Sequence, residues 1–88
     1  MQPSTSLLKF PCEFPLKVMG LASHGFDALV TDIVRRHVTC LQEGAVRAKP
    51  SRAGKYVSLT VTLRAESQDQ IDRLYIELSA HERILMVL

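Results

Sequence analysis

The sequence predicts an α+β fold in which two helices cover one face of a four-stranded antiparallel sheet. Residues 14–88 divide by hydrophobic period into six segments, in the order strand, helix, strand, strand, helix, strand. The segments follow one another closely, and a chain of 88 residues has room for one such core. This βαββαβ order is typical of the ferredoxin-like sandwich, which we expect to form a single domain over residues 10–88.

Composition places the chain among ordinary globular proteins. Apolar residues make up 47% of it and charged residues 23%, which argues against a disordered chain. Residues 1–9 carry no strong pattern, and we expect a flexible N-terminal tail there. Residues 1–6 lack the features of a signal peptide, and no apolar run approaches the ~20 residues that cross a bilayer. We therefore expect a cytoplasmic protein without a membrane partner.

The first strand and the first helix follow from two different apolar periods. A strand is expected over residues 15–19, because Leu16 and Val18 alternate with Lys17 and Met19. A helix is expected over residues 25–39. Its apolar face keeps the i, i+3, i+4 rhythm through Phe26, Leu29, Val30, Ile33, Val34 and His37.

Two further strands are expected over residues 45–49 and 56–64, joined by a loop that contains Pro50 and Gly54. The second of them has the strictest alternation in the chain. Its apolar parity consists of Val57, Leu59, Val61 and Leu63. One face of the sheet is therefore expected to be buried against helices and the other to be polar.

The last helix is expected over residues 68–80, because Ser67 and Gln70 match a capping box at its start. The last strand is expected over residues 83–88 and is apolar on both sides. Simple alternation assigns Ile84, Met86 and Leu88 to the core, and Leu85 and Val87 to the open face.

An apolar cluster is expected on the open face of the sheet. If the first and fourth strands are neighbours, Met19, Leu85 and Val87 lie together there. Exposed apolar clusters usually mark a contact surface. We expect a homodimer that forms through this face or through an edge strand. The alternative is a monomer whose N-terminal tail covers these residues.

Several motifs resemble those of the YbeD family of small bacterial proteins. They are Phe10-Pro11-Cys12-Glu13-Phe14-Pro15-Leu16-Lys17-Val18-Met19-Gly20, Arg36-His37, Lys49-Pro50-Ser51 with Gly54 and Tyr56, and Met86-Val87-Leu88. They fall in order over residues 10–88. The resemblance implies an ACT-like fold, the fold of a regulatory module that senses small molecules. It also implies a regulatory role linked to lipoate metabolism, and it carries no catalytic residues.

The resemblance to ACT-like modules also implies a ligand site near the loop after the first strand. Glycine in that loop lets backbone amides approach a carboxylate. Gly20, Ser23, His24 and Gly25 are the candidate ligand residues. The Asp-x-Pro-Gly pattern of amino-acid-binding ACT domains is missing, so the expected ligand is a small acid or, instead of a ligand, a partner protein.

Metal and catalytic chemistry find little support in the sequence. The loop after the first strand lacks the Cys-x-x-Cys pair of metal carriers with this fold, and it lacks the Arg of acyl-phosphate hydrolases. Ser23 and His24 are adjacent, but no third orienting acid is evident. We expect no metal, no cofactor and no enzymatic activity. Cys12 and Cys40 are expected as free thiols, and the sequence leaves open whether they are close.

A second functional hypothesis starts from a basic segment over residues 47–55. It contains Arg47, Lys49, Arg52 and Lys55 and has no acidic residue. Such a segment can contact phosphates, which makes weak nucleic-acid binding the alternative function. Tyr56 is the one aromatic residue on the outer parity of its strand, so base stacking as in an RNA-recognition sheet is not expected.

Overall fold

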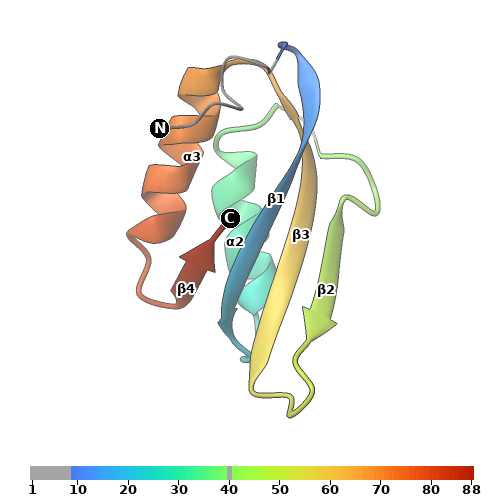
Figure 1. The fold of residues 1–88 in the computed structure, drawn as a ribbon, viewed down its shortest axis with the longest axis vertical. Coiled ribbons are helices and arrows are strands. Elements are labelled where there is room, and N and C mark those ends of the chain that lie inside the picture. Colours follow the sequence, from blue (N-terminus) through green and yellow to red (C-terminus); the bar gives the residue numbers. More distant parts are fainter. Residues whose placement is uncertain (1–8, 40) are drawn as a thin grey trace.

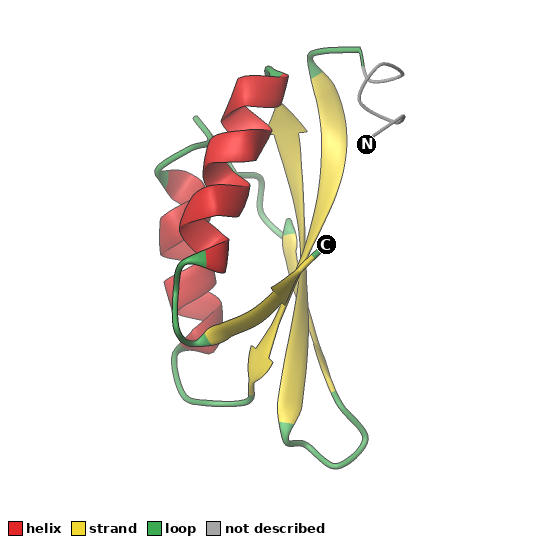
Figure 2. Cartoon of the chain, turned by 60° about the vertical axis from the view of Figure 1, so that its left-hand side comes forward, coloured by secondary structure: helices red, strands yellow, loops and turns green. Residues whose placement is uncertain are grey.

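The computed structural model describes residues 9–39 and 41–88. In these residues one four-stranded antiparallel sheet is combined with two helices (Figure 1). The elements are β1 (Cys12–Leu21), α2 (Phe26–Arg35), β2 (Val46–Pro50), β3 (Tyr56–Ala65), α3 (Gln68–Ser79) and β4 (Ile84–Val87). The strands lie in the order β2-β3-β1-β4, and both helices cover the same face of the sheet (Figure 2). The predicted fold is confirmed, including the neighbouring first and fourth strands.

The centre of the sheet is the pair β1 and β3. They run side by side from Cys12, opposite Ala65, to Leu21, opposite Tyr56. β1 is longer than the predicted 15–19 at both ends: it begins at Cys12, so that Pro15 lies within it, and it ends at Leu21. Proline has no backbone N–H and is tolerated where a strand has a free side. β4 pairs with β1 at residues 18–20, so among the described strands β1 has only β3 beside Pro15.

The core lies between the sheet and the helices, and the hydrophobic periods predicted it well. Its buried side chains are Leu16, Val18, Leu59, Val61, Leu63 and Ala65 from β1 and β3, Phe26, Val30, Ile33 and Val34 from α2, Ile71, Leu74 and Leu78 from α3, and Val38 and Ile84. Full burial of a large apolar side chain contributes roughly 1.5–3 kcal/mol. These contacts fix α2 and α3 against the sheet.

Both helices are shorter than predicted, and α2 differs more. The N–H groups of Arg36 and His37 donate to the carbonyl oxygens of Ile33 and Val34, three residues earlier. Such bonds tighten the last turn and end the helix. His37 therefore lies beyond α2 and not on its apolar face.

The start of α3 confirms the predicted cap. The Ser67 side chain accepts a hydrogen bond from the Gln70 N–H at 3.1 Å. The Gln70 side chain in turn accepts from the backbone N–H of Glu66 at 2.6 Å. The Gln70 N–H, which the start of the helix leaves without a backbone partner, is thus satisfied. The Gln70 side chain bonds to the residue before the N-cap and not to the N-cap N–H of an ideal capping box.

β4 contains an irregularity that simple alternation did not predict. Gly20 pairs with Ile84 and Met19 pairs with Met86, so one step on β1 corresponds to two steps on β4. Leu85 is the extra residue of this bulge. A bulge reverses the side-chain alternation of the strand that contains it.

The bulge corrects the predicted faces of the last residues. Val87 pairs with Val18 and packs against the core, so its placement on the open face was wrong. Met86 and Leu88 were expected in the core, but they are 49% and 61% exposed. The side chain beside Met19 on the open face is therefore Met86.

Candidate functional site

Three of the four candidate ligand residues, Ser23, His24 and Gly25, lie in the loop between β1 and α2, and Gly20 lies in β1. A cation from another part of the chain reaches Ser23 and His24. The Arg83 guanidinium donates to the Ser23 hydroxyl oxygen at 2.6 Å and to the His24 carbonyl oxygen at 3.3 Å. Arg83 and Ser23 are 60 residues apart in sequence. The two meet because β4 runs antiparallel to β1, so the turn before β4 lies beside the end of β1.

Arg83 stands at a shallow hollow of about 340 Å³ on the surface. Its lining consists of Leu21, Ser23, Glu82, Arg83 and Leu85. The leucines are both exposed, at 48% and 55%. A guanidinium and a hydroxyl beside two leucines form a surface that can hold a carboxylate and a short apolar group together.

Two of the candidate ligand residues, Gly20 and Gly25, serve the fold. Gly20 is buried, and the space where a side chain would begin is filled by the ring of Phe26. Gly25 has φ +81° and is the N-cap of α2, where it provides no side-chain acceptor. A positive φ of this kind favours glycine. His24 contributes its carbonyl oxygen to Arg83, and Ser23 lines the hollow.

Sequence reasoning missed Arg83. The expected cation was one within the loop itself, but Gly20 to Gly25 contain neither Arg nor Lys. The cation comes instead from the residue before β4. The order of the strands could have indicated Arg83. In a βαββαβ sheet with β1 beside β4, the start of β4 lies next to the end of β1.

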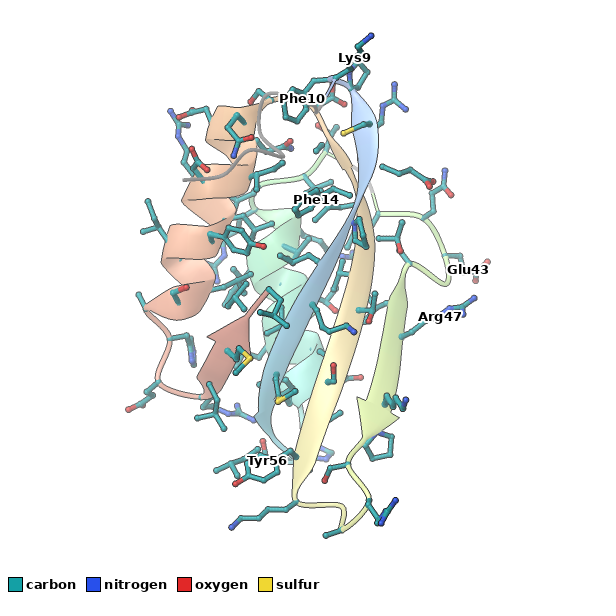
Figure 3. All side chains as sticks on the ribbon, viewed as in Figure 1. Lys9, Phe10, Phe14, Glu43, Arg47 and Tyr56 are labelled. Carbon is teal, nitrogen blue, oxygen red and sulfur yellow. The ribbon has the colours of Figure 1, made fainter. Side chains whose placement is uncertain are left out.

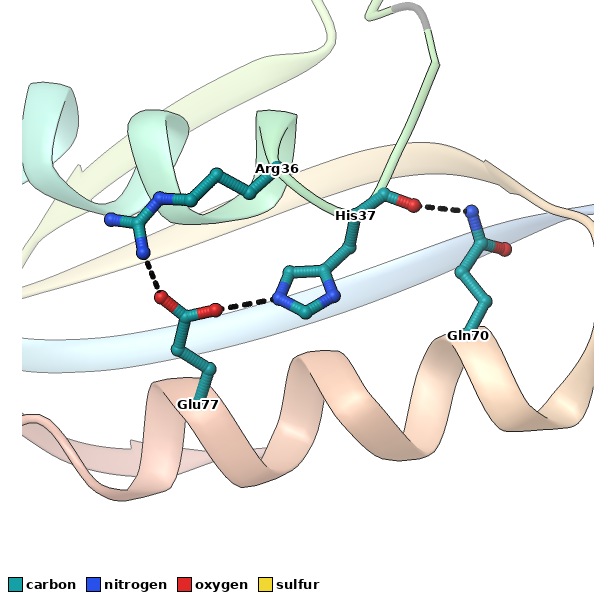
Figure 4. A network of polar contacts seen from close by, with 4 residues as sticks. All are labelled: Arg36, His37, Gln70 and Glu77. Carbon is teal, nitrogen blue, oxygen red and sulfur yellow. Dashed lines mark hydrogen bonds and ion pairs between the residues drawn. The ribbon is translucent and has the colours of Figure 1, made fainter.

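A second polar cluster ties the end of α2 to α3 (Figure 4). The Glu77 carboxylate accepts from Arg36 through one oxygen and lies 2.6 Å from the His37 ring nitrogen through the other. The Gln70 amide donates to the His37 carbonyl oxygen at 2.7 Å. His37 is thus bound to α3 through both its ring and its backbone. This cluster acts as a clamp between the helices.

The structure offers no group of three metal-ligating side chains within residues 9–39 and 41–88. Cys12 is a half-buried free thiol. Cys40, and with it the predicted free thiol at that position, lies outside the described residues. No helix in the described part of the chain is long and apolar enough to cross a membrane.

The four basic candidates occupy two places. Arg47 and Lys49 are exposed on edge strand β2, and Arg52 and Lys55 lie in the loop that joins β2 to β3 (Figure 3 labels Arg47 and Tyr56). The Lys55 ammonium lies 5.6 Å from the ring centre of Tyr56. None of the four forms an ion pair with another residue in the described ranges.

Comparison with known proteins identifies the family. The DUF493 family, described as a protein of unknown function, matches residues 5–88. This chain belongs to the DUF493 family. A UPF0250 protein of Janthinobacterium sp. (strain Marseille) is 46% identical over 88 residues, which cover 100% of this chain and 97% of that protein. A UPF0250 protein of Neisseria meningitidis serogroup A is 43% identical over 84 residues, which cover 96% of this chain and 92% of that protein.

A solved structure with the same fold connects the DUF493 chain to a known module. The ACT domain from GTP pyrophosphokinase of Chlorobium tepidum superposes with a TM-score of 0.65, over 86% of this chain and 84% of that domain. At 10% identity this likeness concerns the fold alone. The expected resemblance to the YbeD family and to ACT-like modules is confirmed.

Proposed function

We propose that this chain is a non-enzymatic regulatory protein that works as a homodimer and binds a small monocarboxylic acid beside Arg83. The DUF493 family has an ACT-like fold, which is consistent with a regulatory role. The observation that carries the proposal is the Arg83 guanidinium, which is held 2.6 Å from the Ser23 hydroxyl at the edge of an apolar hollow.

The lining of the hollow favours one class of ligand. Arg83 can pair with one carboxylate through charge-assisted hydrogen bonds, and Ser23 can donate its hydroxyl proton to the same group. Leu21 and Leu85 can cover a short aliphatic tail. Glu82 also lines the hollow and repels a second negative charge, so monoacids are favoured over diacids.

The contacts of Ser23 support a binding role over a catalytic one. A nucleophilic serine needs a base that accepts its proton. The Ser23 oxygen accepts a hydrogen bond from the Arg83 cation, and Arg83 cannot act as a base. The regulatory effect would come from a change in contacts with another protein when the acid binds.

β4 is an edge strand of the sheet among the described residues, and its outer edge is the proposed dimer surface. The other edge strand, β2, carries Arg47, Lys49 and Pro50, which protect an edge from pairing. β4 instead exposes Leu85 and Met86. Pairing two β4 edges would place the second copy directly beside Leu85, which lines the hollow. Ligand binding and dimer formation would then be coupled.

The ligand arm of the test uses acetate, butyrate, hexanoate, octanoate and lipoate as probes in a thermal-shift titration. Lipoate is included because of the resemblance to the YbeD family. We expect the longer acids to raise the melting temperature of the wild type, and Arg83→Gln to abolish this shift. Arg73→Gln on α3 is the matched control and keeps the shift. Equal shifts for both variants, or none for the wild type, would refute the ligand proposal.

The dimer arm measures mass by light scattering over a dilution series. We expect a wild-type dimer and a monomeric Leu85→Glu variant, because the substitution places a charge at the β4 edge. Ala48→Glu puts the same charge on the opposite edge strand and leaves the dimer intact. A wild type that is monomeric at every concentration would contradict the proposed dimer while leaving the ligand arm unaffected.

A further inference from the structure

Two adjacent rows of residues form the middle of the open face of the sheet. The first row crosses all four described strands, and the second crosses β2, β3 and β1 and ends at Leu88, just after β4. In the first row Met86 lies opposite Met19, Met19 opposite Ser58, and Ser58 opposite Lys49. In the second row Lys17 lies between Thr60 and Leu88, and Arg47 lies opposite Thr60. The Lys17 and Leu88 backbones exchange hydrogen bonds of 3.2 and 2.8 Å. The residues of these rows alternate with the buried core residues of β1 and β3, so they stand on the face of the sheet that the helices leave uncovered (Figure 2).

Both rows change from apolar to basic in the same direction. The β4 half of the face contains Met19, Met86 and Leu88, and the last two are 49% and 61% exposed. The β2 half contains Arg47 and Lys49. Lys17 stands between the halves, with hydroxyl-bearing side chains next to it on β3. The face is therefore amphipathic across its width.

No acidic residue stands in the two rows themselves, although Glu13 and Glu43 line a hollow that Arg47 shares. Within the described residues, Lys17, Arg47 and Lys49 make no ion pair. Arg64, farther along β3, is different: it lies 3.5 Å from Glu66 and opposite Glu13. The three unpaired cations are exposed and available to carboxylates of another molecule.

A notch connects the two halves at the β2–β3 hairpin. It measures about 250 Å³ and is lined by Met19, Lys49, Pro50, Ser51, Tyr56, Val57 and Ser58. The surface that lines it is almost wholly apolar, and Lys49 is among its lining residues. A notch of this size accommodates one large apolar side chain, the usual anchor of a protein contact.

We propose that the open sheet face binds an acidic amphipathic helix of a partner protein. The apolar side of such a helix would cover Met19, Met86 and Leu88, with one large side chain in the notch. Its acidic flank would lie over Lys17, Arg47 and Lys49. Matched charge and matched apolar surface on the same face support this partner. The surface is separate from the hollow at Arg83.

A second copy of this chain fits the face less well. Two open faces packed about a twofold axis near Lys17 would bring like charges together. The exposed side of α3 offers Asp69, Asp72 and Ile76, but Arg73 lies among them and pairs with Asp69 at 2.9 Å. Nucleic acid fits less well too, because Ser58 and Thr60 provide no surface on which bases can stack.

The test uses a synthetic amphipathic helical peptide with leucines on one face and glutamates on the flank, measured by fluorescence anisotropy at two salt concentrations. We expect binding that weakens as salt rises. The double variant Lys17→Glu/Lys49→Glu is expected to bind at least about tenfold more weakly. The matched control Arg35→Glu/Arg73→Glu changes the charge equally on the helical layer and retains binding. The same peptide with Gln in place of Glu should lose most of its affinity.

A substitution in the apolar half distinguishes specific docking of the peptide from general attraction between charges. Met19→Thr removes one wall of the notch and should weaken binding several-fold, whereas Ile76→Thr on α3 should not. Arg83→Gln should bind the peptide as the wild type does. Equal binding by both charge variants, or no effect of Met19→Thr, would overturn the proposal. So would affinity for a single-stranded oligonucleotide instead of the peptide, or wild-type polymers that Lys17→Glu/Lys49→Glu abolishes.

Discussion

Gly20 of β1 lies against the ring of Phe26, the first residue of α2, without room for a side chain. A methyl group at Gly20 would stand 2.5 Å from two carbon atoms of the Phe26 ring and 2.6 Å from the Arg83 carbonyl oxygen. Gly20 therefore serves close packing between the start of α2 and the start of β4. Arg83 takes part in this packing through its carbonyl oxygen and contacts Ser23 through its guanidinium.

Gly20→Ala is expected to lower the free energy of unfolding by roughly 1–3 kcal/mol, because it overpacks a buried site. Urea unfolding followed by circular dichroism measures this change. A double-mutant cycle with Phe26→Leu provides the control, since a smaller side chain at position 26 should recover part of the loss. Additive effects of the two substitutions would show that the Gly20–Phe26 contact is not the cause.

Ser67→Ala is expected to destabilise the chain by about 1 kcal/mol, because the Gln70 N–H at the start of α3 loses its acceptor. The denaturation midpoint in urea measures the loss. Ser79→Ala, at the exposed end of the same helix, is the control and should change stability by less than about 0.5 kcal/mol. If both serine variants unfold together with the wild type, the cap has no energetic role.

Glu77→Ala is expected to cost at most about 1 kcal/mol, because its partner Arg36 is 60% exposed and solvent weakens the pair. The substitution removes the carboxylate that binds both Arg36 and His37 and so connects the end of α2 to α3. Urea unfolding at low and at high salt measures the loss of unfolding free energy, and this loss should become smaller as the salt concentration rises. Glu82→Ala removes an acid that lies outside the clamp and serves as the control. A salt-independent loss would contradict an ionic role for Glu77.

Tyr75→Phe is expected to change how stability depends on alkaline pH. Burial raises the pKa of the Tyr75 phenol above its ordinary value of 10.0. Since the folded pKa lies above the unfolded one, the contribution is fully present below pH 10 and is lost as pH rises through the folded pKa. The wild type should therefore lose more stability above pH 10 than Tyr75→Phe does, as measured by urea midpoints at increasing pH.

The control for that comparison is Tyr56→Phe, which leaves Tyr75 in place. It should lose stability at alkaline pH as steeply as the wild type. Equal slopes for the wild type and Tyr75→Phe would mean that Tyr75 does not contribute to the alkaline loss.

Much of the fold could be predicted because its elements follow local rules. Strict alternation along β3 and the 3.6-residue period of α2 identify the inward residues, and Ser67 with Gln70 marks the start of α3. The end of α2 could not be predicted in the same way, because His37 continues the apolar rhythm. Its ring is instead bound by Glu77, a contact 40 residues away in sequence.

The candidate site was predicted only in part. Ser23 and His24 were identified in the loop after β1, but Arg83 was not, because only the antiparallel pairing of β1 with β4 brings it there. The faces of β4 depended on the bulge at Leu85. Alternation alone cannot locate a bulge in a strand that is apolar on both sides.

The sequence by itself determined the order of the six elements, most of the core and the cap of α3, because periodicity and capping act over a few residues. The tertiary structure decided which side chains of β4 face outward, which cation stands beside Ser23, and where the basic and apolar halves of the open face meet. These features depend on strand register and on contacts between distant segments, which leave little trace in local sequence.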